Sequence, residues 1–299
     1  MILERIPIFK MNGFLLIDKP KGVTSANCVY RLRKFLGIKK IGHCGTLDPL
    51  ATGLLPICIG EATKFSSFMS DLDKTYEVDI SFGIETDTGD IDGEIISKGI
   101  NKFTETDLKK VLKSFQGPQM QLPPMYSALK IKGIPLYRWA RKGVFLKRNC
   151  RDITIHKIEV LEFKDYLLKL KVSCTKGTYI RSLVESIGRS LLTKATVLSL
   201  RRLSIGGTQS DDMVLMPNKE MSDLSNSILP SDFLLKHLTK AILNKEDVKK
   251  VRNGQSIYYN AQLKKKGLVR IYTNKGLFMG IGELDSSNKL SPRRLIAIN

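Results

Sequence analysis

The 299-residue chain contains few of the residues that build metal centres or disulfide frameworks. It has three histidines and five cysteines, and no two cysteines form a C-x-x-C pair. Zinc-finger spacing, an H-E-x-x-H helix and a phosphate-binding P-loop are also missing from the sequence. We therefore expect neither a bound metal nor a nucleotide cofactor. An odd number of scattered cysteines further predicts reduced thiols in a cytoplasmic protein.

Long apolar runs are missing as well. No uninterrupted apolar stretch reaches the length of about 18 residues that a transmembrane helix requires. Residues 1–7 include an early acid and lack the apolar centre of a signal peptide. We expect a protein that is not associated with a membrane.

Acidic residues are in the minority, with 29 Asp and Glu against 49 Lys and Arg, which leaves a net charge of +20. Neutralising the phosphates of a polyanion requires many distributed cations, so this surplus indicates a nucleic-acid partner. Residues 137–141, YRWAR, interleave cations with aromatic rings, a combination that suits RNA because rings and guanidinium planes stack on bases. An ordinary strand and turn of the core is the alternative for this segment.

The most distinctive stretch is residues 42–53, GHCGTLDPLATG, in which glycines flank a single carboxylate. Pro49 disfavours helical backbone at Asp48, so the acid is expected in a loop. The apolar run at residues 54–60 is typical of a buried strand. Loop residues beside a rigid element often carry function, whereas loop aspartates also commonly bond their own backbone. These residues alone leave both interpretations of Asp48 open.

Hydrophobic periodicity predicts both strands and helices along the chain. Strands are expected at residues 14–17, 54–60, 74–82, 153–158 and 168–174, and helices after Thr24 or Ser25, from residue 104 and from residue 180. The last helix would place Arg181 in its first turn, where a cation opposes the helix dipole. This unfavourable position suggests an anionic partner such as Asp48, and a solvent-facing arginine is the alternative.

Two further segments bear on the organisation of the chain. The acidic run at residues 87–94 cannot be a calcium loop, because no register supplies the required acids, glycine and glutamate, and we predict a hairpin turn instead. The composition from residue 211 to 231 predicts a linker. Residues 267–272 and 277–282 flank T-N-K-G, a hairpin signal within what we expect to be a small β-barrel.

The order of these motifs resembles one family, the bacterial tRNA pseudouridine-55 synthases of the TruB type. The matching segments between residues 18 and 206 are DKPKGVTS, GHCGTLDPLATGLLPICIGEATK, KTYEVDISFG, PPMYSALKIKGIPLYRWARKG, CTKGTYIRSL and LRRLSIG. The tail segment VRIYTNKGLFMGIGEL resembles a PUA domain, an RNA-binding module. A lone L-D-P would be a weak signal, whereas six segments in the family's order are specific.

The resemblance implies an α/β (α+β) fold with a mixed, largely antiparallel central sheet, flanking helices and an active-site cleft. It places the catalytic domain at residues 1–235, including a linker at about 211–235, and a PUA-like β-barrel at residues 236–299. The implied activity is isomerisation of uridine 55 in the T-loop of tRNA to pseudouridine, without a cofactor or metal. We expect a cytoplasmic monomer with no obligate protein partner.

Three positions match the family's catalytic residues. Asp48 corresponds to the family's essential aspartate, and Arg181 corresponds to the arginine that pairs with that acid. Tyr76 corresponds to the tyrosine that stacks on the target base. Breaking the C1′–N1 bond and remaking it as C1′–C5 requires a group that stabilises a cationic sugar or bonds to it transiently, and an ionised carboxylate can do either. Attack at C1′, addition to the base and a glycal route all remain open.

Other positions match residues around the substrate. Tyr179 and Leu200 correspond to the lining of the uracil pocket, and Lys19 and Pro20 to a turn beside the substrate. His43 corresponds to a histidine that fills the space left when bases flip out of the stack. The resemblance thus predicts five substrate-binding residues in addition to Tyr76.

Two alternatives to a TruB-type enzyme remain. One is a non-catalytic RNA-binding or RNA-folding factor that has kept the scaffold, which the presence of Asp48, Tyr76 and Arg181 argues against. The other is the RNA-guided synthase subunit of a ribonucleoprotein particle. That type is expected to carry lysine-rich tails and additional N-terminal sequence. The chain also departs from the family pattern at Cys44, at Ser186 and at residues 193–196, which bears on local loop geometry.

Overall fold

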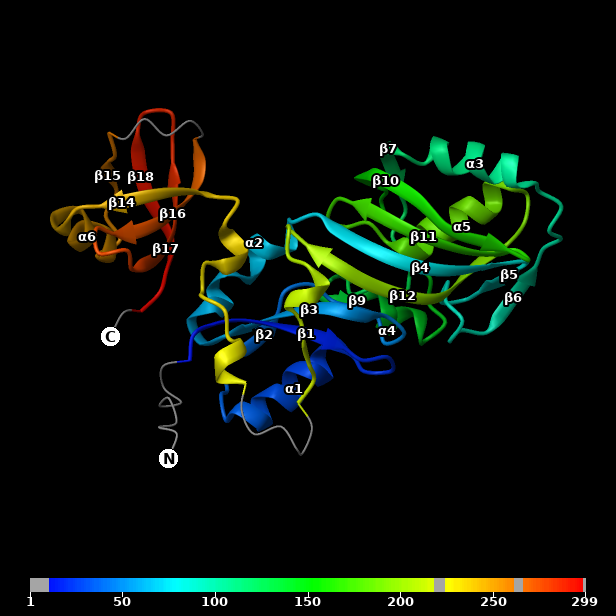
Figure 1. Ribbon diagram of the computed structural model, residues 1–299, viewed down its shortest axis with the longest axis horizontal. Helices are drawn as coiled ribbons and strands as arrows, with labels where there is room; N and C mark the ends of the chain where they lie inside the picture. Colours follow the sequence, from blue (N-terminus) through cyan, green and yellow to red (C-terminus); the bar gives the residue numbers. More distant parts are fainter. Residues whose placement is uncertain (1–10, 218–223, 261–265, 298–299) are drawn as a thin grey trace.

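A large mixed sheet forms the centre of the protein, and a smaller curled sheet follows it in the chain (Figure 1). The computed structural model describes residues 11–217, 224–260 and 266–297, so the predicted absence of a signal peptide at residues 1–7 lies outside the described residues. Within these ranges the large sheet has nine strands in the order β13-β1-β3-β12-β4-β11-β10-β7, with β2 paired to β3. The strands are β1 (Gly13–Lys19), β2 (Ile41–His43), β3 (Thr52–Ile59), β4 (Lys74–Phe82), β7 (Gly117–Gln121), β10 (Arg151–Lys164), β11 (Leu167–Cys174), β12 (Ala195–Ile205) and β13 (Val214–Leu215).

The predicted mixed, largely antiparallel sheet is confirmed. Only β1 with β13 and β3 with β12 run parallel among the described pairs of this sheet, and the other neighbours are antiparallel. The alternation of residues 74–82 buries every second side chain of β4, as a half-exposed strand requires. By contrast β3 is buried on both faces, which explains its continuous apolar run.

The longer helices α1, α3 and α5 cover one face of the sheet, and the short helix α2 with two 3₁₀ segments covers the other. The helices are α1 (Ser25–Leu36), α2 (Ser66–Ser70), α3 (Glu105–Ser114), α4 (Leu136–Ala140), α5 (Ile180–Ser190) and α6 (Lys245–Arg252), with 3₁₀ segments η2 (Gly60–Phe65), η3 (Ser210–Asp212), η4 (Ser225–Ser227) and η5 (Phe233–Leu235). Apolar residues of α1, α3 and α5 form one core with Leu55 and Ile57 of β3. On the opposite face, Leu54 and Cys58 pack with η2, α2 and η5.

The predicted helix starts are present and have local causes. The Thr24 hydroxyl accepts the backbone N–H of Asn27 at 3.1 Å, which caps α1. At α3, Thr104 and Asp107 form a reciprocal capping box. The acidic run forms the predicted turn between β5 (Ile84–Thr86) and β6 (Ile95–Lys98).

For residues 137–141 the alternative of a strand and turn is wrong, and the contact of this segment with RNA stays a prediction. The segment forms α4 after the hairpin β8 (Lys130–Ile131) and β9 (Ile134–Pro135), because Leu136 and Ala140, four residues apart, are both buried on one helix face. Helical spacing also brings the Arg141 guanidinium carbon to 5.4 Å from the centroid of the Tyr137 ring.

The described residues contain no helix with the length and apolarity to cross a membrane.

The described parts of the stretch predicted as a linker, residues 211–217 and 224–231, include backbone pairing with β1. Val214 and Leu215 pair with β1 as β13, and Phe14 and Leu229 exchange backbone hydrogen bonds of 2.9 and 2.7 Å. Local composition does not show that a segment pairs with the edge of a strand far away in the sequence. The Asn- and Ser-rich composition therefore suggested a loosely packed segment. The boundary between residues 235 and 236 stays a prediction.

The C-terminal sheet has the order β14-β16-β17-β18-β15, and its predicted hairpin joins β16 to β17. The strands are β14 (Thr239–Leu243), β15 (Ile257–Tyr258), β16 (Gly267–Thr273), β17 (Phe278–Leu284) and β18 (Lys289–Leu295). The sheet docks on η2, where the rings of Phe65 and Phe278 lie 5.4 Å apart and Lys64 Nζ donates to the Leu295 carbonyl at 2.9 Å. In Figure 1 the C-terminal sheet lies on the side of the large sheet where α2, which directly follows η2, is labelled.

Glu61 provides the first testable prediction, because its carboxylate joins η2 to the segment that follows β18. Burial opposes its ionisation, but the N–H of Ala297 and the ammonium groups of Lys40 and Lys64 outweigh that effect and lower the pKa of Glu61 to about 2. A depressed folded-state pKa adds stability that is fully present above pH 4.5 and is lost as the pH falls toward 2. Glu61→Gln should therefore reduce the free energy of unfolding at pH 7 by about 1–2 kcal/mol.

Urea unfolding at pH 7 and pH 3 measures the effect, and the gap between wild type and variant should shrink at the lower pH. Glu246→Gln in α6, an exposed pair with Lys250, is the matched control and should change little. An equal gap at both pH values would contradict the assignment.

Candidate active site

The loop that carries Asp48 connects β2 to β3 and is anchored on both sides. The Ser25 hydroxyl accepts the Leu47 N–H at 2.9 Å and donates to the Leu47 carbonyl at 3.1 Å. The Gly22 N–H donates to the Pro49 carbonyl at 2.8 Å. Leu47 is buried in the core, which leaves the neighbouring Asp48 side chain 34% exposed. Asp48 is therefore a rigidly held loop carboxylate that solvent or a ligand can reach.

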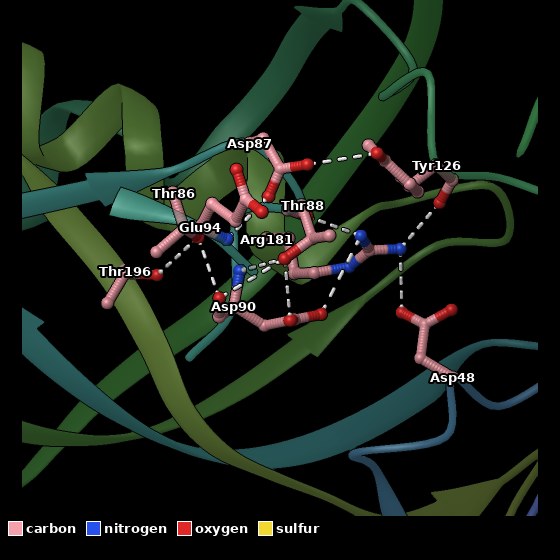
Figure 2. A network of polar contacts seen from close by, with 9 residues as sticks. All are labelled: Asp48, Thr86, Asp87, Thr88, Asp90, Glu94, Tyr126, Arg181 and Thr196. Carbon is pink, nitrogen blue, oxygen red and sulfur yellow. Dashed lines mark hydrogen bonds and ion pairs between the residues drawn. The ribbon is translucent and has the colours of Figure 1, made fainter. Parts of the chain in front are cut away.

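An ion pair joins Asp48 to Arg181, with 2.8 Å between Oδ2 and Nη2 (Figure 2). The guanidinium is only 5% exposed, and it also donates to the carbonyls of Thr88 at 2.5 Å and Tyr126 at 2.8 Å. The Asp90 carboxylate lies 3.8 Å from Nη1. Contacts from three chain segments thus fix the guanidinium that faces the Asp48 carboxylate.

The start of α5 places Arg181 at this position. Tyr179 occupies the N-cap, and its side chain makes no capping hydrogen bond. Instead Gln121 of β7 caps the helix, because its side-chain oxygen accepts the Tyr179 N–H at 2.7 Å and its amide donates to the Tyr179 carbonyl at 3.0 Å. Sequence patterns gave no signal for this tertiary cap.

Asp90 belongs to the turn at residues 87–94 and was not predicted as a site residue. Its carboxylate accepts the Thr88 hydroxyl at 2.7 Å, and burial raises its pKa. The acidic composition of the turn was visible in the sequence. What local patterns could not show is that Asp90 and the Thr88 carbonyl face a guanidinium from α5.

Five of the predicted residues line one cavity of about 320 Å³: Asp48, Tyr76, Tyr179, Arg181 and Leu200. Burial raises the pKa of both phenols, so both are neutral at pH 7. The cavity combines a charged pair with aromatic and aliphatic walls, which suits a flat polar ligand carrying a reacting centre near the carboxylate.

Lys19, Pro20 and His43 do not line this cavity. Lys19 is fully buried and donates to the carbonyls of Pro20, Val23 and Pro49 at 2.9, 2.6 and 3.3 Å, and burial lowers its pKa. It therefore supports the Asp48 loop from the interior. Pro20 is exposed.

His43 is half-buried at the end of β2, and burial lowers its pKa, so the ring is neutral at pH 7. Its Nδ1 atom has no hydrogen-bond partner among the described residues. Contact of Lys19, Pro20 or His43 with a substrate stays a prediction.

Arg202 and Lys74 also line the cavity, and sequence reasoning missed both. Burial and the nearby charge of Arg202 lower the pKa of Lys74 to about 8. Lys74 of β4 and Arg202 of β12 reach the same cavity because these two strands pair, and the sequence did not reveal that pairing.

Comparison with known proteins identifies the family. The model of the TruB family pseudouridylate synthase N-terminal domain matches residues 33–180, and that of the pseudouridine synthase II TruB C-terminal domain matches residues 239–296. The tRNA pseudouridine synthase B of Chromobacterium violaceum is 41% identical over 291 residues, which cover 96% of this chain and 95% of that protein. The chain belongs to the TruB family of pseudouridylate synthases.

Other members and structures agree with this placement in the TruB family. The tRNA pseudouridine synthase B of Buchnera aphidicola is 41% identical over 302 residues, covering 96% of both chains. A chain of the Cbf5-Nop10-Gar1 complex superposes with a TM-score of 0.73 at 25% identity, covering 99% of this chain and 87% of its own. A chain of the archaeal box H/ACA sRNP Nop10-Cbf5 complex shares the fold, with a TM-score of 0.70.

Arg181→Lys tests the geometry of the ion pair in this TruB-family enzyme. A lysine keeps the charge but cannot bond Asp48 and the carbonyls of Thr88 and Tyr126 together. We expect pseudouridine formation to slow by roughly 10- to 100-fold, the cost of a small misplacement of a reacting group. Single-turnover rates measure this, with Arg189→Lys on the exposed face of α5 as the matched control. Equal rates for Arg181→Lys and wild type would remove the pairing from the mechanism.

Proposed function

We propose that the protein converts uridine 55 in the T-loop of tRNA to pseudouridine. The observation that carries the proposal is the Asp48–Arg181 ion pair at the cavity that Tyr76, Tyr179 and Leu200 also line. The names of the relatives, tRNA pseudouridine synthase B, support tRNA as the substrate.

The target nucleotide must leave its base stack to react. A cavity of about 320 Å³ accommodates one nucleoside but not a base pair, so the enzyme acts on a flipped nucleotide. Flipping costs a few kcal/mol of stacking, which contact with the Tyr76 and Tyr179 rings offsets. His43 is proposed to occupy the space that the base vacates.

The chemistry is an isomerisation in which one bond is exchanged for another. The C1′–N1 bond breaks, C1′ bonds to C5, the C5 proton leaves and N1 gains a proton. Asp48 acts on the ribose or the base as the ionised group that makes C1′–N1 cleavage possible, and Arg181 holds it ionised and oriented. Tyr76 stacks on the uracil and assists movement of the C5 proton.

The C-terminal sheet is proposed as a PUA-like RNA-binding domain spanning residues 236–299, joined to a catalytic domain at residues 1–235. With a net charge of +20, both parts contribute to tRNA binding. The proposal includes a cytoplasmic monomer that needs no cofactor and no obligate protein partner.

Asp48→Asn tests the central role of the carboxylate. The amide has the same shape but no charge, so it can neither bond to C1′ nor stabilise a cationic sugar, and we expect no pseudouridine at position 55. Affinity for tRNA should stay within about threefold, because one carboxylate contributes little to phosphate-dominated binding. Tritium release from C5-labelled uridine in a T-loop minihelix measures the reaction.

Asp79→Asn on the outer face of β4 is the isosteric control and should retain activity. Turnover by Asp48→Asn at the wild-type rate would refute the assignment of Asp48. Activity at a different uridine in wild-type protein would refute the choice of site.

Salt dependence tests the interpretation of the charge. Release of counterions from phosphates makes the logarithm of the affinity fall linearly with the logarithm of salt concentration. Between about 50 and 200 mM salt we expect the tRNA affinity to drop by roughly a hundredfold or more. Filter binding at several concentrations measures the slope, and a flat dependence would contradict phosphate-dominated binding.

A further inference from the structure

Helix α5 places Arg181 in the active site, but the sequence of this helix supplies no cap of its own. The N-cap residue is Tyr179, whose side chain makes no capping hydrogen bond, and the first turn contains no acid. The other described helices of eight or more residues are each capped by the side chain of their own N-cap residue, Thr24, Thr104 or Asn244. The Tyr179 ring lines the cavity instead. Capping of α5 is therefore left to a residue from another element.

Gln121 of β7 is that residue. Its side-chain oxygen accepts the Tyr179 N–H at 2.7 Å, and its amide donates to the Tyr179 carbonyl at 3.0 Å. A backbone N–H can only donate and a carbonyl can only accept, so the two bonds together fix the position and the orientation of the amide. Gln121 is 9% exposed, which leaves little room for water to replace either bond.

A second contact joins the same two segments of the chain. The Tyr126 carbonyl, which follows Gln121 along the chain, accepts the Arg181 Nη2 at 2.8 Å. Residues 123–124 between them are both proline, which restricts the backbone of this connection. Gln121 thus holds the start of α5 through Tyr179, and the Tyr126 carbonyl holds the guanidinium that belongs to the next turn. The stiff connection keeps these two contacts at a constant spacing.

We propose that Gln121 is a positioning residue for the Asp48–Arg181 ion pair. By holding the start of α5 against β7, its amide sets where the Arg181 guanidinium meets the Asp48 carboxylate. A local cap would require a small polar side chain at position 179, and the cavity would lose an aromatic wall. Capping from β7 leaves Tyr179 available to the substrate. The proposal rests on the proposed function, in which Asp48 acts on a flipped uridine.

Gln121→Met tests the proposal, because methionine has a similar length but cannot donate to the Tyr179 carbonyl and accepts only weakly. At saturating enzyme, the single-turnover rate of pseudouridine formation should fall roughly tenfold or more, because the reacting carboxylate is misplaced. The Kd for tRNA should stay within about threefold, since phosphate contacts dominate binding. A purely structural role would lower the fraction of folded enzyme and leave this rate constant unchanged.

Gln119→Met is the matched control on the same strand. Gln119 lies two residues before Gln121 on the same face of β7, and its amide donates to the Ser114 carbonyl at 3.2 Å, away from α5. This variant should keep the wild-type rate.

A double variant tests whether the effect passes through Arg181. In an Arg181→Lys background, Gln121→Met should slow the reaction by less than about a further threefold, because the guanidinium that the cap positions is absent.

A spectroscopic measurement reads the cap directly. In protein labelled with ¹⁵N-tyrosine, the amide signal that is lost in Tyr179→Phe should move upfield in its proton dimension in Gln121→Met, as expected for an N–H that loses its acceptor. The same signal should stay in place in Gln119→Met.

Gln121→Glu is the second variant, for use if Gln121→Met does not fold. Its carboxylate keeps the acceptor for the Tyr179 N–H at the positive end of α5 but offers no donor to the Tyr179 carbonyl. It should fold and slow the single-turnover reaction by about threefold or more.

Four outcomes would overturn the proposal. These are a wild-type rate constant in the folded Gln121 variant, rate losses that multiply in the double variant, an unmoved Tyr179 amide signal, and loss of the fold in both Gln121 variants, which would make the residue structural. Failure of the wild-type protein to modify uridine 55 is a separate result. It would reject the proposed function, whereas the Tyr179 amide signal would still report on the cap.

Discussion

The proposed active site depends on one interaction, the ion pair between a partly exposed carboxylate and a buried guanidinium. Without Arg181 the Asp48 side chain would be free to rotate on its anchored loop, and without Asp48 the buried guanidinium would keep only the more distant Asp90 carboxylate, 3.8 Å away. Together they form a fixed anion at the cavity wall, with 2.8 Å between Nη2 and Oδ2. Burial of the guanidinium strengthens the pair, because less solvent screens it.

The surrounding fold serves to hold that pair in place. The turn after β5 supplies the Thr88 carbonyl and the Asp90 carboxylate, and the segment before β8 supplies the Tyr126 carbonyl. On the other side, buried Lys19 bonds the Pro49 carbonyl and supports the Asp48 loop. Residues from distant parts of the sequence therefore converge on two side chains, which is possible because the central sheet brings their strand ends together.

Local patterns were sufficient where the determinants are local. The alternation of β4 and the apolar stripe of α5 were predicted from periodicity, and an arginine in a first helical turn suggested an acidic partner. Asp90 and Gln121 were not predicted as site residues. Each contacts the first turn of α5 only in the folded protein, where β7 and the turn at residues 87–94 lie beside that helix. The strand at Val214 was not predicted for the same reason, since it forms only against the edge of β1.

The position of the flipped nucleotide in a crystal structure with a T-stem-loop RNA would show whether Asp48 acts on the substrate. We expect the Asp48 carboxylate about 3–3.5 Å from the reacting carbon of the nucleotide at position 55, still bonded to Arg181. A nucleotide bound away from this carboxylate, or an Asp48 turned from Arg181 in the complex, would contradict this expectation.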